Sequence, residues 1–363
     1  MFLTSETDFG LNMLRQTPLN ESVVVSPISV LFTLAMLHAG AKGKTKAQIN
    51  EVIGIGASDD SLMLYFCDLL TKVHNSTSGV QSQIANGFFL NKQYKIEKNF
   101  EETISTKLHT KIEVLNFTNS LNAAKIINAF VSEATGGKIH EMVNDDTVRD
   151  TFSLLINAVY FSGDWLERFY NSSNTKGLFY SEEKTNREVE FMNDHDVYKD
   201  YAENDEVEVL SLPYKDTTYA FNIILPKKRF GLESVRSKID GEEIQKLLFE
   251  LEPAHVSIRI PKIKIETDYK LKEALVNMGV SEIFSDSSNL SNIAKDPPLK
   301  VSQASHKAII EVQEEGTTAS AATLFKIIPK KAIVDEPKKF VVDHPFLFIL
   351  TKNNNPLFIG QFV

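Results

Sequence analysis

Cysteine is almost missing from this sequence, and its absence limits how the chain can be held together. Cys67 is the single cysteine among 363 residues, so no disulfide can form within the chain. It lies in the apolar run LMLYFCDLL, where we expect a buried structural thiol rather than a reactive one. Stability must therefore come from a packed core, for which a hydrophobic content of 42% is ordinary.

Long apolar runs are also missing. No stretch approaches the roughly 20 apolar residues of a membrane-spanning helix. The opening MFLTSETDFGLNMLRQ has acidic and polar residues where a secretory signal has an apolar block. We therefore expect a cytoplasmic protein with no membrane partner. There the five Asn-x-Ser/Thr sequons would stay unglycosylated; they begin at Asn20, Asn75, Asn116, Asn171 and Asn289.

Basic charge and catalytic signatures are scarce as well. The net charge is −9, and the 39 basic residues are scattered, which argues against a nucleic-acid partner. The sequence has no nucleophile elbow, His-Glu-x-x-His or paired-carboxylate motif. Gly43-Lys44-Thr45 resembles part of a phosphate loop, but His38 stands where that loop needs its first glycine. We expect neither an enzyme nor a metal or cofactor site.

Helix and strand signals are distributed unevenly along the chain. Periodic apolar patterns predict helices mainly in the first half, at 5–16, 27–40, 44–52, 61–73, 98–108 and 122–134. Phe152–Phe161 is a continuous apolar run, typical of a strand covered on both faces. Strand patterns dominate from Val189 onward, and no linker, repeat or composition shift divides the sequence. We therefore predict a single α+β domain covering residues 1–363.

One stretch, residues 311–334 (EVQEEGTTASAATLFKIIPKKAIV), has an unusual composition. It begins as a strand, and seven small uncharged residues in a row follow Gly316. A flexible linker would have more glycine, and a core strand would have larger side chains. The composition suits a segment that is a loop in one state and a central strand in another. The alternative is an Ala/Thr-rich surface loop or short helix.

The sequences around this stretch favour the first interpretation. His306-Lys307-Ala308 lies upstream, and Asp343-His344-Pro345-Phe346 and the terminal NNNPLFIGQFV lie downstream. Together with SVVVSPISVLFTLAMLHAGAKGKT and LINAVYFSGDWLERF, they resemble the serpin family from the first helix to the last residue. The resemblance implies that family's α+β fold, with eight to nine helices around three β-sheets. It also implies an exposed reactive-centre loop at about residues 314–334.

The resemblance further implies three groups of site residues, although a lone histidine or tryptophan is more often an ordinary core residue. The hinge at the start of the loop comprises Glu314, Glu315, Gly316, Thr317, Thr318, Ala319, Ser320, Ala321, Ala322 and Thr323. The shutter, a polar cluster under the central sheet, comprises Ser26, Ser29, Asn157 and His306. The breach, where that sheet opens, comprises Trp165, Lys262 and Glu314.

For function, the resemblance implies a suicide-substrate inhibitor of proteases, whose cleaved loop enters the central sheet with the acylated protease attached. The side chains to be buried on insertion are small and uncharged: Thr317, Ala319, Ala321 and Thr323. From Gly316 to Lys330 is 14 residues, about 46 Å as a strand. The expected partner is a target protease, and the inhibitor is expected to be a monomer with a tendency to polymerise.

The reactive bond follows from the spacing of the family's inhibitory members. Sixteen residues after Glu314 comes Lys330, followed by Lys331. A lysine there suits a trypsin-like serine protease, whose specificity pocket holds a carboxylate. The register could shift to Lys331, a cathepsin-like cysteine protease would also accept lysine, and the pair could be a solubilising surface feature. Two other classes remain: a non-inhibitory serpin acting as carrier or chaperone, and a cytosolic hydrolase, for which no catalytic constellation is present.

Overall fold

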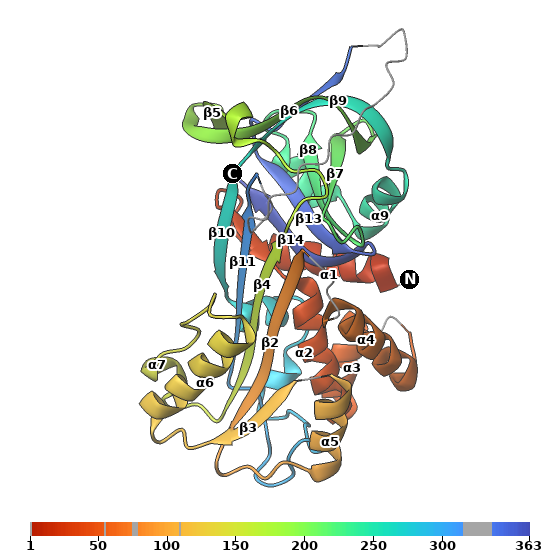
Figure 1. Cartoon of the computed structure of the whole chain (residues 1–363). Coiled ribbons are helices and arrows are strands. Elements are labelled where there is room, and N and C mark those ends of the chain that lie inside the picture. Colours follow the sequence, from red (N-terminus) through yellow and green to blue (C-terminus); the bar gives the residue numbers. More distant parts are fainter. Residues whose placement is uncertain (1, 54–55, 75–78, 109, 315–335) are drawn as a thin grey trace.

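The computed structural model of the chain describes residues 2–53, 56–74, 79–108, 110–314 and 336–363. These residues form helices packed on two β-sheets, so the predicted α+β fold is confirmed (Figure 1). Two counts differ from the prediction. The described residues contain ten α-helices instead of eight to nine, and their strands join into two sheets instead of three.

The sheet count differs because one long strand, β6 (Thr185–Glu203), pairs with three others. It pairs with β5 (Thr175–Glu182) at its start, with β9 (Glu252–Pro261) in its middle and with β7 (Val207–Pro213) at its end. Strands that would otherwise form separate sheets are thereby hydrogen-bonded into one. The helix count includes α7 (Asp145–Val148), a single turn too short to show helical periodicity in the sequence.

The nine-stranded sheet forms the upper part of the molecule in Figure 1. Its order is β1 (Val23–Val25), β14 (Asn355–Phe362), β13 (Phe346–Lys352), β8 (Tyr219–Pro226), β7, β6, β9 and β12 (Lys338–Val341), with β5 paired to β6.

The five-stranded sheet extends downward from it. Its order is β10 (Ile263–Tyr269), β11 (Gln303–Val312), β4 (Ser153–Gly163), β2 (Val80–Asn91) and β3 (Lys111–Leu115). Every residue of β4 is buried, as the continuous apolar run predicts.

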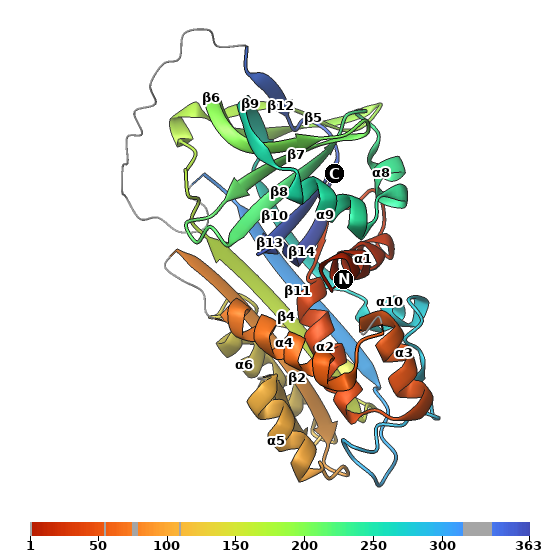
Figure 2. The ribbon, with the colours of Figure 1, turned by 90° about the vertical axis from the view of Figure 1, so that its right-hand side faces the viewer.

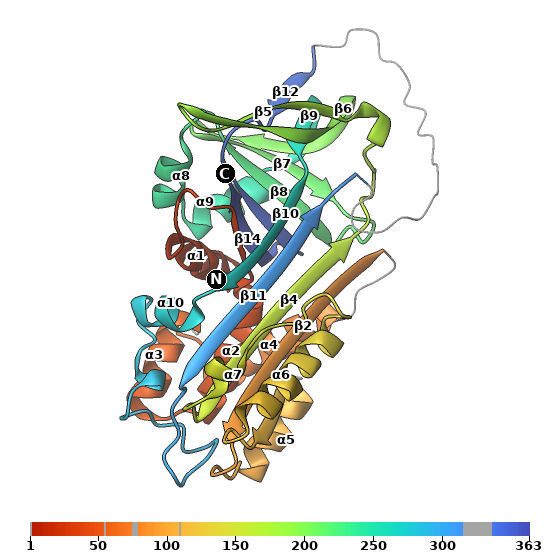
Figure 3. The ribbon, with the colours of Figure 1, turned by 90° about the vertical axis from the view of Figure 1, so that its left-hand side faces the viewer.

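Helices cover both faces of the five-stranded sheet. The view in Figure 2 shows α2 and α4 in front of it, and the opposite view in Figure 3 shows α6 and α7 in front. The ten helices are α1 (Phe2–Arg15), α2 (Pro27–Gly40), α3 (Gly43–Ile53), α4 (Asp59–His74), α5 (Lys98–Lys107), α6 (Ser120–Ala134), α7, α8 (Leu232–Lys238), α9 (Gly241–Phe249) and α10 (Leu271–Asn277).

Helix α2 is the central helix of the core. Pro27 occupies its first turn, where a missing N–H costs no hydrogen bond, and Ser26 precedes it in extended conformation. Every residue of α2 except Ala39 is buried, so its nearly uniform apolar composition has a structural reason. The helix therefore places Ser26 and Ser29 beneath the five-stranded sheet.

Two smaller expectations differ from the structure. Cys67 is partly exposed on α4, so it is not a fully buried thiol. The first helix begins at Phe2 instead of Ser5. Asp8 lies within this helix, and its carboxylate accepts a hydrogen bond of 2.6 Å from the backbone N–H of Gly241, at the start of α9. Within the described ranges, no helix is long and apolar enough to cross a membrane.

Candidate functional site

The boundary between β4 and β11, called the seam below, is the feature around which the predicted site residues gather. The two strands run parallel and pair from Gln303 with Leu154 to Ile310 with Phe161. Their outer neighbours, β2 and β10, are both antiparallel to them. A strand inserted into the seam would run opposite to both β4 and β11. One parallel ladder would then be replaced by two antiparallel ladders, which are slightly more stable per residue.

The upper end of the seam carries a charged network around Glu314. Lys262 Nζ lies 2.6 Å from the Glu314 carboxylate and 2.9 Å from that of Glu190. The Asn174 amide donates to both carboxylates, at 2.9 Å to Glu190. Burial alone raises the pKa of Glu314, but hydrogen bonds from Lys262, its own backbone N–H and Asn174 outweigh burial and lower the pKa overall. Glu314 is thus ionised and bound to Lys262, which directly precedes β10, and to the segment that follows β4.

Trp165 closes the same end of the seam from the β4 side. Its indole N–H donates to the carbonyl of Gln313 at 2.7 Å, and its ring stacks on Tyr214 at 4.4 Å between centroids. The Phe169 N–H also donates to the Glu314 carbonyl, at 2.9 Å. The structure therefore brings together Trp165, Lys262 and Glu314, the three predicted breach residues.

Asn157, on β4, is the centre of a second network halfway down the seam. The Ser29 hydroxyl donates to Asn157 Oδ1 at 2.6 Å, and the Asn157 amide donates to Asn86 Oδ1 on β2 at 2.6 Å. His306 Nδ1 also bonds to Asn157 Oδ1, which links β11 to β4 directly. These bonds hold both sides of the seam to helix α2.

The protonation state of His306 follows from its contacts. The backbone N–H of Ser26 donates to His306 Nε2 at 3.1 Å, so Nε2 is an acceptor and Nδ1 carries the proton. Burial lowers the pKa of His306 to about 3, so the ring stays neutral at physiological pH. All four predicted shutter residues lie together, although the Ser26 hydroxyl has no hydrogen-bond partner within the described chain.

Four participants were missed by the sequence analysis: Thr33, to which the Asn157 amide donates at 3.4 Å, Asn86, Asn174 and Glu190. Asn86 carried a signal, because it is a polar residue inside the largely apolar run IANGFFL at residues 84–90. Asn174 and Glu190 carried no such signal, since they lie in polar segments and come close to Glu314 and Lys262 only when the chain is folded. The predicted hinge residues 315–323 and the predicted reactive bond, Lys330–Lys331, lie outside the described residues.

Comparison with known proteins identifies the family. A family model described as serpin (serine protease inhibitor) matches residues 4–363. The chain belongs to the serpin family. Members of this family are generally protease inhibitors, and the predicted resemblance is confirmed.

Individual relatives agree over nearly the full length of this serpin. Iripin-1 of Ixodes ricinus is 33% identical over 98% of the chain and 93% of its own length. Serine protease inhibitor 42Dd of Drosophila melanogaster is 30% identical over 97% of the chain and 93% of its own length. The solved structure of Serpin48, described as a highly specific serpin of the insect Tenebrio molitor, superposes with a TM-score of 0.89 at 28% identity, covering 99% of this chain and 97% of that one.

Proposed function

We propose that this serpin is a suicide-substrate inhibitor of trypsin-like serine proteases, cleaved after Lys330. The observation that carries the proposal is the parallel seam between β4 and β11, with the predicted hinge directly following β11. A chain that turns back after β11 arrives antiparallel to both flanking strands, which is the orientation the seam can accept. Insertion of the cleaved loop then completes the sheet.

The chemical step belongs to the protease. Its serine oxygen attacks the Lys330 carbonyl carbon, the Lys330–Lys331 peptide bond breaks, and an acyl ester forms on Lys330. The general base of the protease takes the serine proton and passes it to the departing amine of Lys331. If the loop inserts before water reaches the ester, the protease remains attached to the inhibitor.

The choice of protease class rests on the Lys330 side chain. When Lys330 enters the specificity pocket, its buried ammonium pairs with a carboxylate, which a neutral side chain cannot do. Recognition of this polar kind can change kcat/KM by several orders of magnitude. A cathepsin-like cysteine protease is the alternative target. A non-inhibitory carrier or chaperone is the alternative function, in which the cleaved loop would stay outside the sheet and cleavage would leave the thermal stability unchanged.

The test is a denaturing gel after the protein is mixed with trypsin. We expect a detergent-resistant band at the summed mass of the two proteins. Mass spectrometry should find a released C-terminal peptide that begins at Lys331, whereas one beginning at Ala332 moves the reactive bond by one residue. The Lys330→Ala variant is the matched control and should associate with trypsin at least about 100-fold more slowly. Complete cleavage without any stable complex contradicts the proposed function.

A further inference from the structure

Glu190, on β6, binds the same two donors as Glu314. Lys262 Nζ lies 2.9 Å from the Glu190 carboxylate and 2.6 Å from the Glu314 carboxylate, and the Asn174 amide donates to both. Within the described part of the chain, Lys262 is the only cation that forms an ion pair with either carboxylate. Two negative groups thus share one ammonium and one amide.

Three members of this network are attached to the nine-stranded sheet. Glu190 is part of β6, and the Lys262 N–H donates to the Glu190 carbonyl at 3.0 Å. Asn174 directly precedes β5, whose first residue pairs with Phe191 on β6. We call Asn174, Glu190 and Lys262 the socket. Glu314 reaches the socket from just beyond the end of β11, and Figure 3 shows β5, β6 and β9 above the tip of that strand.

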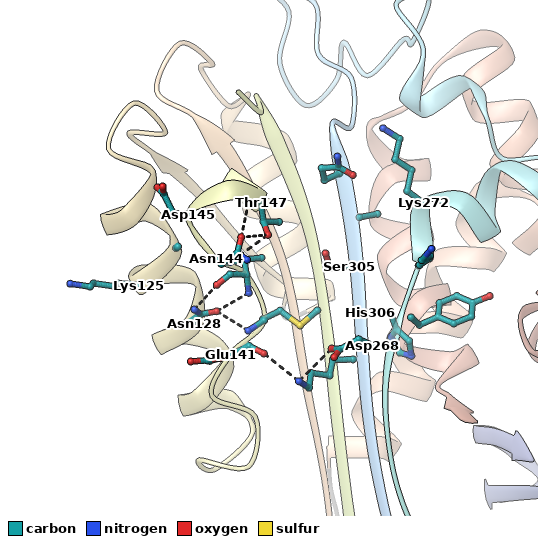
Figure 4. Close-up of a pocket in the computed structure, with 18 of the residues that line it drawn as sticks. Lys125, Asn128, Glu141, Asn144, Asp145, Thr147, Asp268, Lys272, Ser305 and His306 are labelled. Atoms are coloured by element: carbon teal, nitrogen blue, oxygen red, sulfur yellow. Dashed lines mark hydrogen bonds and ion pairs between the residues drawn. The ribbon is translucent and has the colours of Figure 1, made fainter. Parts of the chain in front are cut away.

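The other ion pairs of β11 do not hold the seam closed, because they run to its outer neighbour β10, on the same side of the seam. These pairs are Glu311 with Lys264, and Lys307 with Glu266 and Asp268. On the α6 side of β11, Figure 4 shows a groove of about 810 Å³. Within the described ranges one hydrogen bond crosses this groove, from Lys307 Nζ to the Glu141 carbonyl at 3.4 Å. Of the described ion pairs around β11, the pair between Glu314 and the socket is therefore the one that opposes opening.

Glu190 lowers the affinity of the socket for Glu314 in two ways. In the closed seam the two carboxylates repel each other, because both bind the same ammonium. When Glu314 leaves, Lys262 and Asn174 keep Glu190 as a partner, so less free energy is lost than if both donors were left without one. Hydrogen bonds from Lys262 and Asn174 lower the pKa of Glu190, which keeps this carboxylate ionised at neutral pH.

We propose that Glu190 competes with Glu314 for Lys262 and Asn174, and so sets how readily the upper end of the seam opens. Glu190 acts through these two donors, so it is a positioning residue. A socket without this competitor would bind Glu314 more tightly and hold the seam closed for longer. The consequence for protease trapping rests on the proposed function, whereas the competition itself is a property of the uncleaved protein.

Hydrogen exchange in the uncleaved protein tests the competition. Trp165 is the only tryptophan in the sequence, so isotope-labelled tryptophan gives a single indole N–H signal by NMR. This N–H donates to the carbonyl of Gln313, next to Glu314, and its exchange rate therefore reports opening of the upper end of the seam. We expect exchange in Glu190→Gln to be about three- to fivefold slower than in the wild type, because the neutral amide does not repel Glu314. Loss of a merely structural contact would make exchange faster.

Glu188→Gln is the matched control for this measurement. Glu188 lies two residues before Glu190 on β6, and it pairs with Lys176, 3.3 Å away, instead of Lys262. Its loss should leave the exchange rate of the Trp165 indole within about 1.5-fold of the wild type. If the Glu190→Gln protein exchanges as fast as the wild type or faster, Glu190 does not compete with Glu314 and the proposal is overturned.

The same variants mixed with trypsin connect the competition to inhibition. A seam that opens less readily gives water more time to hydrolyse the acyl ester. We therefore expect Glu190→Gln to need at least about twofold more inhibitor molecules cleaved per complex formed, and Glu188→Gln to match the wild type. A Glu190→Gln protein with slowed exchange and an unchanged ratio overturns the role of Glu190 in trapping. If the wild type forms no complex at all, the proposed function fails, whereas the exchange rates still decide whether Glu190 competes with Glu314.

Discussion

Glu6 is a buried carboxylate with no cation beside it. It lies on α1 with 3% of its surface exposed, and one carboxylate oxygen accepts from the Asn355 amide at 2.9 Å. The other oxygen has no partner among the described residues. Burial raises the pKa of Glu6 to about 7, and hydrogen bonds from Asn355 and Tyr65 offset only part of that effect. Asp68, on α4, pairs with Lys72 at 2.6 Å.

The raised pKa of Glu6 predicts that stability falls as pH rises through neutrality. Folding favours the protonated form, so this contribution is fully present below the ordinary pKa of 4.5 and is lost as pH rises to about 7. The ionised group costs roughly 3 kcal/mol. Glu6→Gln removes that cost, so we expect its thermal midpoint to exceed the wild-type value by several degrees at pH 8.5 and to match it at pH 4.5.

The exposed Glu51 on α3 provides the control for this measurement. Glu51→Gln should leave the midpoint within about one degree of the wild type at both pH values, because an exposed carboxyl has little to gain from neutralisation. A Glu6→Gln advantage of the same size at pH 4.5 and 8.5 would show that ionisation of Glu6 is not the cause.

Among the site residues, the sequence analysis found those that fall in the motifs of the family it resembles, such as Asn157 and His306. Their local sequence alone does not name the partners that they contact. Asn174 and Glu190 are polar residues in polar segments, and nothing local distinguishes them. Their role comes from a contact with Glu314, which lies 140 positions from Asn174 in the chain. Such contacts are properties of the fold and leave no local pattern.

At the level of elements, the sequence patterns that matched the structure were those that burial alone explains. The apolar run at β4 and the proline-started helix α2 were located because burial on all sides leaves few alternatives. The sheet boundaries were not, because β6 begins with exposed residues, continues with a mixture of buried and exposed ones, and pairs with three strands. Pairing partners determine where a sheet ends. The local sequence predicts which segments are buried better than it predicts which strands pair with each other.

The hinge is the element whose side chains decide whether insertion can occur. Thr317 would be the first of the alternate side chains to be buried in the seam, and an unpaired guanidinium there costs several kcal/mol. We therefore expect Thr317→Arg to fold and to be recognised by trypsin, but to be cleaved as a substrate. The number of inhibitor molecules cleaved per complex formed should rise by about tenfold or more.

Thr318→Arg is the matched control, because its side chain would point to the opposite face of the inserted strand. This control should raise the number of inhibitor molecules cleaved per complex formed far less than Thr317→Arg does. If Thr317→Arg traps trypsin as efficiently as the wild type, the loop does not enter the seam in this register.

In the whole molecule, contacts at the breach and the shutter keep β4 paired with β11. Under the proposed function the seam must open to accept the cleaved loop, and it would then also accept a strand from a second copy of the protein. An opened seam presents two unpaired strand edges, and open edges recruit strands from other chains. If the protein is a monomer as expected from the sequence, we expect that state to depend on the ionic contacts that close the upper end of the seam.

Reversing the charge of Glu314 should open the upper end of the seam and cause the protein to polymerise. In Glu314→Lys the pair between the buried Glu314 carboxylate and the partly exposed Lys262 ammonium is replaced by two like charges. This costs less than the roughly 3–5 kcal/mol of a fully buried pair, because water screens the Lys262 side chain. We expect the variant to form ladders of polymers on native gels after incubation at temperatures where the wild type stays monomeric. Glu311→Lys is the control, since Glu311 lies near the end of β11 and loses its pair with the exposed Lys264, 2.8 Å away, without removing any contact of Glu314. Polymers in both variants would indicate general destabilisation of β11. If the Glu314→Lys protein stays monomeric, Glu314 is not one of the residues that keep the seam closed.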